Sequence, residues 1–339
     1  MSFFKKFFGK VIHDRNNDED TIRVKGKPKP KYYGTVSPYP NFNASSDASV
    51  LQKAIESKGV DEDVIIAVLV KRSNEQRQKI KVVYEASTGE RLDRALKSVL
   101  RSDLEDISLA LLMSPAHFDA YLLRKATKRL GTDESVLVEV LATRTNEEIL
   151  ELKRVFKEEY DTELEEVIKD ETSGDFTTAL LAMLKANKDE TDEIDMDLAR
   201  RDAETLFESG ENTSGVNVSA FIDILTKRSG PQLSKTFQQY ARISDLTLPK
   251  ALDLELKGDI EDCLTDIGKD FIISSASFSQ GYGTCEDTLI RVLVSRSEID
   301  LKKIVEEYKA MYDLRIQEDI LNDTKGHYQD VLLGLCGPH

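Results

Sequence analysis

The stretch DESVLVEVLATRTNEEILELKRVFKEEY, residues 133–160, decides the fold class of this chain. Its apolar residues recur at three- and four-residue spacing, which is typical of amphipathic helices that bury one face. The stretch 61–87, DEDVIIAVLVKRSNEQRQKIKVVYEAS, has the same pattern. Prolines and glycines fall between such segments, and alternation with a period of two residues is almost absent. The sequence therefore predicts an all-α fold.

The helical pattern recurs in four copies that align with one another, at residues 61–77, 133–149, 216–232 and 285–301. In each copy the first apolar helix ends in an arginine followed by serine or threonine, and these arginines are Arg72, Arg144, Arg228 and Arg296. A turn dipeptide follows each arginine at the same distance, and the four dipeptides are SD at 102–103, GD at 174–175, GD at 258–259 and the variant GH at 326–327.

A multi-helix unit of this kind buries its apolar faces only when neighbouring copies stack, which is the signature of a repeat architecture. We expect a head at residues 1–46, with an irregular proline-bearing lead-in after its first helix. The four copies are expected at 47–113, 114–186, 187–269 and 270–339.

The bulk composition narrows the possible functions. The chain has 339 residues and a formal net charge of −15. This negative charge argues against binding to nucleic acid and against direct electrostatic attraction to an anionic membrane. No apolar run approaches the roughly 20 residues that a membrane-spanning helix needs. The three cysteines (Cys263, Cys285 and Cys336) are widely spaced and odd in number, so we expect core residues or unreactive thiols in a reducing cytoplasm.

A glycine-rich turn precedes each arginine-bearing helix, and an acidic residue follows three of these turns at a constant distance of forty residues. The pairs are Gly131 with Glu171, Gly215 with Glu255, and Gly283 with Asp323. Turn carbonyls and a carboxylate are the hard oxygen ligands that Ca²⁺ prefers. In the first copy the same step from Gly59 reaches Val99, although Glu62 and Glu105 lie nearby. The alternative is that the glycines only cap helices and the acids lie on a solvated face.

Other site chemistries have weaker support. No EF-hand loop of the D-x-D-x-D-G type is present. The four histidines (His13, His117, His327 and His339) are scattered, and none pairs with a cysteine at zinc-ligand spacing. No nucleophile elbow, zinc-protease motif or phosphate-binding loop occurs, so we do not expect an enzyme.

Several short motifs of the sequence resemble those of the annexin family. They are the turns KRLGTDE and QGYGTCED, the motifs GTDES and SRSEIDL, and the later turns TSGDF and KGDI. The resemblance covers residues 47–336, and the stretches VSPYPNFNASSDASVLQKAI and LDLELKGDIEDCLT are most similar to the lipocortin-type members. It implies five helices per repeat in a slightly curved disc. It also implies that Ca²⁺ is shared between loop carbonyls, the distant acid and a lipid head group, which supplies a positive bridge to an acidic membrane.

The same resemblance implies a ligand set that this chain matches unevenly. In the second copy the set is Thr127, Arg129, Gly131 and Glu171; in the third it is Gly210, Thr213, Gly215 and Glu255, with Asp253 and Leu256 as a minor site. In the first copy it is Gly59, Val60 and Glu62, with a second minor site at Lys97, Leu100 and Glu105; in the fourth it is Ser279, Gly281, Gly283 and Asp323. Arg129 stands where the family pattern has glycine, and SGVN in the third copy replaces the expected KGTD.

The fourth copy departs from the others before its loop. Asp103 and Gly131 are 28 residues apart, whereas Asp259 and Gly283 are only 24 apart, a difference of about one helical turn. The remaining stretch FIISSASFSQ is rich in serine and β-branched residues, which are poor helix formers. We expect the first helix of the fourth copy to be short or absent.

The opening stretch MSFFKKFFGKVI has no uninterrupted apolar core of the kind that a signal peptide needs. On a helix its apolar residues share one half of the surface, and they are Phe3, Phe4, Phe7, Phe8, Val11 and Ile12. Such a helix suits a membrane interface or the apolar groove of a partner, and the resemblance suggests a small dimeric EF-hand protein as that partner. It could also pack on the protein's own core or fray.

The leading functional expectation is calcium-dependent binding to acidic phospholipid membranes such as those containing phosphatidylserine. The resemblance adds membrane aggregation or bridging, and phospholipase inhibition by covering the lipid substrate. It implies a cytoplasmic protein that is peripheral on plasma and vesicle membranes in calcium, with a nuclear pool as a further possibility. The alternative is a helical repeat scaffold that binds protein partners through its N-terminal amphipathic helix.

Overall fold

A computed structural model describes residues 33–128, 131–210, 217–267 and 286–337. The chain divides into two units, residues 1–32 and residues 33–339. The whole first unit, including the predicted apolar helix at Phe3–Ile12, lies outside the described residues. The expectation of a short first helix in the fourth copy falls in 268–285 and lies outside them too.

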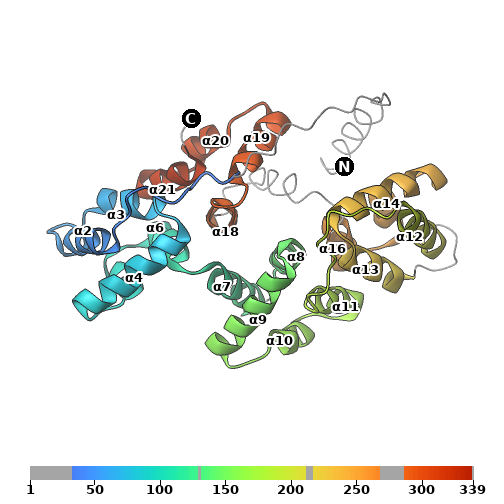
Figure 1. Cartoon of the computed structure of the whole chain (residues 1–339), viewed down its shortest axis with the longest axis horizontal. Helices are drawn as coiled ribbons and strands as arrows, with labels where there is room; N and C mark the ends of the chain where they lie inside the picture. Colours follow the sequence, from blue (N-terminus) through green and yellow to red (C-terminus); the bar gives the residue numbers. More distant parts are fainter. Residues whose placement is uncertain (1–32, 129–130, 211–216, 268–285, 338–339) are drawn as a thin grey trace. The chain divides into compact units, whose positions relative to one another are not determined.

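The described residues form 19 helices and no strand, so the predicted all-α class is confirmed (Figure 1). The first repeat has α2 (Ala44–Glu56), α3 (Glu62–Val70), α4 (Asn74–Thr88), α5 (Leu92–Val99) and α6 (Ser102–Leu112); the second has α7 (Pro115–Lys128), α8 (Glu134–Thr143), α9 (Asn146–Tyr160), α10 (Leu164–Glu171) and α11 (Gly174–Met183). The third has α12 (Met196–Ser209), α13 (Val218–Lys227), α14 (Gly230–Ile243), α15 (Leu248–Glu255) and α16 (Asp259–Ile267); the described part of the fourth has α18 (Glu286–Arg296), α19 (Leu301–Tyr312), α20 (Ile316–Asp323) and α21 (Gly326–Cys336).

In the first three repeats the serine or threonine after the repeated arginine is the N-cap of the next helix, whereas in the fourth repeat α19 begins at Leu301 after Asp300. Ser73 accepts a hydrogen bond from the backbone N–H of Gln76, and the Gln76 side chain accepts one from the backbone N–H of Ser73. Thr145 and Glu148 form the same reciprocal pair at the start of α9. This capping box satisfies two backbone donors that a helix start otherwise leaves unpaired. The repeated sequence signature is therefore a helix boundary.

The repeated arginine itself forms an ion pair beneath that boundary. Arg72 binds Asp47 of α2 with both ends of the carboxylate, and its Nε lies 2.6 Å from Asp47 Oδ2. Arg144 binds Asp119 of α7 in the same way at 2.6 Å. Burial by itself would lower the pKa of the Arg144 guanidinium, but Asp119, together with Glu148 and Glu139, more than offsets this effect and the pKa is raised. Each pair fixes the first helix of a repeat against the end of the second.

The same two-ended pair joins Arg228 to Asp202 of α12 in the third repeat. In the fourth repeat Arg296 binds Asp300, four residues further along the chain.

The core is continuous through the repeats, because helices from different repeats pack on one another. Helix α3 packs against α21 and α6 against α18, which joins the first repeat to the fourth. Helix α8 packs against α16 and α11 against α13, which joins the second repeat to the third. Cys263 and Cys336 are free and buried in this core, and burial raises the pKa of each thiol to about 12. Both thiols are therefore protonated and unreactive at neutral pH.

The segment before α2 runs from the fourth repeat to the first. The backbone N–H groups of Thr35 and Val36 donate to the carbonyl of Ser297, and the N–H of Lys302 donates to the carbonyl of Tyr33. The Thr35 hydroxyl donates to the carbonyl of Leu335.

Four residues further on, the backbone of Tyr39 exchanges two hydrogen bonds with the Gln76 side chain, and the Tyr39 ring lies 3.7 Å from the Arg72 guanidinium carbon. We call residues 33–39 the strap.

Within the described residues, none of the helices has both the length and the apolar character that crossing a membrane requires.

Candidate calcium-binding loops

The loop between α7 and α8 is closed by its own backbone. The N–H of Asp133 donates to the carbonyl of Ala126 at 3.0 Å, and the Asp133 side chain then accepts the N–H of Val136 to start α8. Gly131 lies inside this closed loop with φ +95°, a conformation that side-chain-bearing residues rarely adopt. The tight turn at Gly131 thus depends on glycine.

The second half of this candidate site comes from the end of α10. Glu171 is the last residue of that helix and is exposed. The hydroxyl of Thr132, next to Gly131, donates to the backbone carbonyl of Glu171 at 3.1 Å. The structure therefore brings together the glycine turn and the acid that the forty-residue spacing associates.

The remaining residues of this predicted set are described in part. Thr127 is buried, and its hydroxyl donates to the carbonyl of Leu123 at 2.9 Å, which leaves its own backbone carbonyl as the ligand atom it can offer. Arg129 lies outside the described residues.

The loop between α2 and α3 is closed by the same backbone hydrogen bond, but different residues stand at the positions of the candidate ligands. The N–H of Asp61 donates to the carbonyl of Ala54 at 3.0 Å, Asp61 caps α3, and Gly59 has φ +83°. Val60 occupies the position of Thr132, and the last residue of α5 is Val99, not an acid. Of the predicted ligands, Glu62 lies on the first turn of α3 and contacts Nδ1 of His327.

An arginine covers the second predicted site of the first repeat. Arg101 Nη1 donates to the backbone carbonyl of Leu100 at 2.6 Å and reaches that of Lys97 at 3.5 Å. These are two of the three predicted ligands, and the third, Glu105, is half-buried on the first turn of α6. A guanidinium already satisfies the oxygens that a cation would use, so calcium binding there requires Arg101 to move. Nothing in the sequence pattern of the repeats marks Arg101 for this role.

In the third loop, the backbone hydrogen bond that closes the loop spans one residue more than in the first two. The N–H of Asn217 donates to the carbonyl of Ser209, the last residue of α12, at 2.9 Å, and Gly210 is the C-cap of that helix. Thr213 and Gly215 lie outside the described residues. Glu255 is the exposed last residue of α15, the position that Glu171 holds on α10.

The predicted minor site beside Glu255 consists of the buried Leu256 and of Asp253, which belongs to a small cluster of acidic side chains. Leu256 is buried, and because its side chain has no polar atom, the only ligand it can offer is its backbone carbonyl. Asp253 faces Glu261 on α16, and the pKa of Glu261 is raised by burial first and then by repulsion from Asp253 and Asp262. A bound cation would relieve this repulsion. Glu261 stands where Glu105 stands in the first repeat, so it is a further candidate that the alignment of the copies could have found.

Of the four ligands predicted in the fourth repeat, only the acid lies within the described residues. Asp323 is the exposed last residue of α20, while Ser279, Gly281 and Gly283 lie outside the described residues. The position after the acid is capped in the same way as after Glu171, since the N–H of Thr324 donates to Ile320 and that of Thr172 to Ile168. The three predicted acids therefore stand at the same structural position.

The described donor set fits calcium. It consists of exposed carboxylates at helix ends and of glycine turns, and every candidate ligand atom is a hard oxygen. Among the described residues, neither a thiolate nor an imidazole belongs to the site between Gly131 and Glu171, so this set does not suit zinc.

Comparisons with known proteins agree with this architecture. The sequence model of the family described as Annexin matches residues 46–111, 118–183, 201–267 and 276–335. Annexin A1 of Homo sapiens is 45% identical over 344 residues, which cover 99% of this chain and 99% of the human protein. Annexin A1 of Mus musculus is 44% identical with the same coverage.

Solved structures give the same result. Annexin III aligns with a TM-score of 0.89 at 40% identity, over 91% of this chain and 98% of its own. Calcium-bound annexin (Sm)1 aligns with a TM-score of 0.81 at 28% identity, over 91% of this chain and 93% of its own. The chain belongs to the annexin family, whose members are non-enzymatic proteins that bind phospholipid membranes peripherally in a calcium-dependent manner.

Proposed function

We propose that this protein docks on acidic phospholipid membranes through calcium ions held by the second, third and fourth loops, with the first loop as a weaker site. The observation that carries the proposal is the hydrogen bond between Thr132 and the backbone of Glu171. This bond holds the end of α10, with its exposed Glu171 carboxylate, next to the glycine turn. The turn carbonyls and the carboxylate would together supply the protein's share of a calcium coordination sphere. The lipid phosphate and water would complete the sphere, so the ion would bridge two negatively charged partners.

Net charge explains why the ion is needed. At −15 the chain is repelled by an anionic surface, and cations bound at the loops reverse the sign of the charge locally. The calcium-bound structure of annexin (Sm)1 supports calcium as the ion.

Sedimentation with phosphatidylserine vesicles tests the proposal. The full chain should pellet with vesicles in micromolar to millimolar calcium, remain in the supernatant with a chelator, and show little binding to vesicles of neutral phosphatidylcholine. Equal pelleting with calcium and with chelator would contradict the proposal and favour the scaffold alternative.

The head carries a second part of the proposal. The six apolar residues at Phe3–Ile12 would form a contact that does not depend on calcium, either with a second membrane or with the apolar groove of a partner such as a small dimeric EF-hand protein. Membrane aggregation would then follow, because the loops hold one membrane and the head reaches another. Phospholipase inhibition would follow from covering the lipid substrate.

Deleting residues 1–12 separates these activities. Vesicle aggregation, followed by turbidity, should fall while calcium-dependent sedimentation stays as in the full chain. Unchanged turbidity would remove the head from vesicle aggregation.

A further inference from the structure

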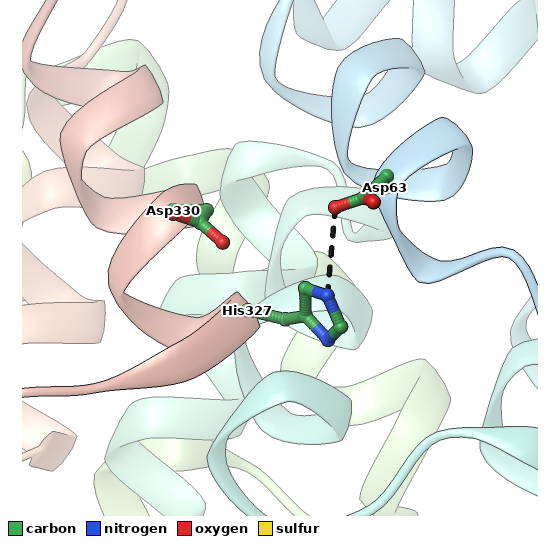
Figure 2. Close-up of side chains that lie close together, drawn as sticks. All are labelled: Asp63, His327 and Asp330. Carbon is green, nitrogen blue, oxygen red and sulfur yellow. Dashed lines mark ion pairs between the residues drawn. The ribbon is translucent and has the colours of Figure 1, made fainter.

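Three side chains that can bind a metal meet where the first repeat packs on the fourth (Figure 2). Asp63 comes from α3, and His327 and Asp330 come from the first turns of α21. One ligand atom from each lies within 4.8 Å of the other two. Asp63 and Asp330 are exposed and His327 is half-buried, so an ion can reach all three from solvent.

A fourth residue orients the histidine. Nδ1 of His327 contacts the Glu62 carboxylate, while Nε2 faces Asp63 Oδ1 at 3.4 Å. A proton on Nδ1 satisfies the contact with Glu62 and leaves Nε2 as a lone-pair donor on the side of Asp63. A carboxylate that holds the outer nitrogen of a metal-binding histidine is the usual arrangement in zinc proteins.

The internal repeat shows that this histidine is a departure within the chain. The position holds aspartate in the other three repeats, at Asp103, Asp175 and Asp259. At the matching junction of α6 with α18, Asp103 lies near Asp106, Glu286 and Asp287, which stand at the positions of Asp330, Glu62 and Asp63. The described acids around Asp103 offer oxygen ligands, whereas the junction at His327 adds one imidazole nitrogen to its carboxylates.

The chemistry of the donors selects the type of ion. Carboxylates alone suit calcium and magnesium, and an added imidazole shifts the preference toward zinc and related transition metals. Zinc commonly takes three protein ligands with water in the fourth position.

We propose that Asp63, His327 and Asp330 bind a zinc-type divalent cation at the junction of the first and fourth repeats, with Glu62 as the residue that orients His327. The ion would join α3 to α21 and would be separate from the ions between the glycine turns and Glu171, Glu255 and Asp323. Because Glu62 is also a predicted ligand of the first calcium loop, zinc would compete for that residue with calcium.

Calorimetric titration of the full chain with zinc chloride in calcium-free buffer tests this site. The wild type should bind one zinc ion that is lost, or weakened at least about tenfold, in both His327→Ala and His327→Asp. The aspartate variant reproduces the residue of the other three repeats, so its fold should be intact. Glu62→Gln should weaken zinc binding about tenfold, as expected for an orienting residue.

His117→Ala is the matched control. His117 is an exposed histidine on α7 that contacts Ser114 and Glu159, and its loss should leave zinc binding unchanged. Two outcomes would overturn the proposal: a wild type that binds no zinc under these conditions, or His327 variants that bind zinc as the wild type does while circular dichroism shows normal helix content. Asp330→Asn gives a second check, since it leaves every histidine in place and should still lower the affinity.

Discussion

The first and second repeats have the same scaffold but differ in what the scaffold presents. Both close the loop before their second helix with the same backbone bond, both place glycine at positive φ inside it, and both join the first helix to the end of the second with a buried arginine–aspartate pair. Only the second repeat adds the Thr132 hydroxyl and the Glu171 carboxylate, because Val60 and Val99 stand at these positions in the first. The loop geometry is therefore set by the closing backbone bond and the helix cap, and the ligand side chains vary independently of it.

The largest effect is expected where the two repeats agree. Asp119→Ala leaves the Arg144 guanidinium buried without its partner and should lower the free energy of unfolding by about 3–5 kcal/mol, with a similar loss for Asp47→Ala. Denaturant unfolding measures both. Glu151→Ala removes an exposed ion pair with Arg154 and should leave the unfolding midpoint unchanged. A large loss in one repeat only would show that the shared scaffold is not equivalent in the two.

The next effect separates the repeats. Glu171→Gln should lower the calcium affinity of the second loop by on the order of tenfold or more, because calcium sites are tuned by the number of charged ligands. Glu105→Gln in the first repeat should have a much smaller effect, since Arg101 covers the carbonyls of its predicted site. Calcium titration by calorimetry gives both values. Equal losses would place the first repeat among the main sites.

A smaller effect is expected from the bond that joins loop to acid. Thr132→Val removes the hydrogen bond to the Glu171 carbonyl, which costs about 1 kcal/mol, and should weaken calcium binding about fivefold while the Glu171 side chain is kept. The control is Val60→Thr, which adds a hydroxyl where no acid follows and should not create a calcium site. An unchanged affinity in Thr132→Val would mean that the carboxylate is positioned without this bond.

The smallest effect concerns an acid on the first turn of α6 and its counterpart on α11. Burial first, and then repulsion from Glu286, Asp106 and Asp287, raise the pKa of Asp103 above its ordinary value. A carboxyl group whose pKa is raised on folding gives stability that is present at low pH and is lost as the pH rises through that pKa. Asp103→Asn should therefore raise the unfolding temperature at pH 7 relative to wild type, and the gain should shrink below about pH 4.

Asp175→Asn is the control for this prediction, because Asp175 is exposed at the same position of the second repeat. Both substitutions remove a negative charge near a helix N-terminus, so the difference between them isolates the repulsion. If the difference in unfolding temperature between the two variants did not change with pH, the raised pKa of Asp103 would be contradicted.

Much of the fold could be predicted from the sequence because its determinants are local. Apolar spacing predicted the helices, and in the first three copies the Arg-Ser and Arg-Thr pairs that revealed the repeat join a helix cap to an ion pair between helices. The forty-residue step predicted where the acids lie, since the same helices separate glycine from acid in every copy. Glu171, Glu255 and Asp323 each end the corresponding helix.

What the sequence could not show depends on contacts between distant segments. Arg101 follows a predicted ligand directly, but its cover over two carbonyls depends on how its side chain folds back. The scattered histidines gave no zinc motif, yet His327 meets Asp63 because α21 packs on α3 across nearly the whole chain length. One signal was available: GH stands where three other copies have SD or GD.

The strap has a mechanical consequence. Its first hydrogen bonds go to Ser297, Leu335 and Lys302 of the fourth repeat, although the next residues in the chain belong to the first. A pulling force applied to residues before Tyr33 therefore loads the last repeat before it reaches α2. If the head is attached to a second surface while the loops hold the first, the tension reaches the fourth repeat through the hydrogen bonds of Thr35 and Val36 before it reaches the first repeat.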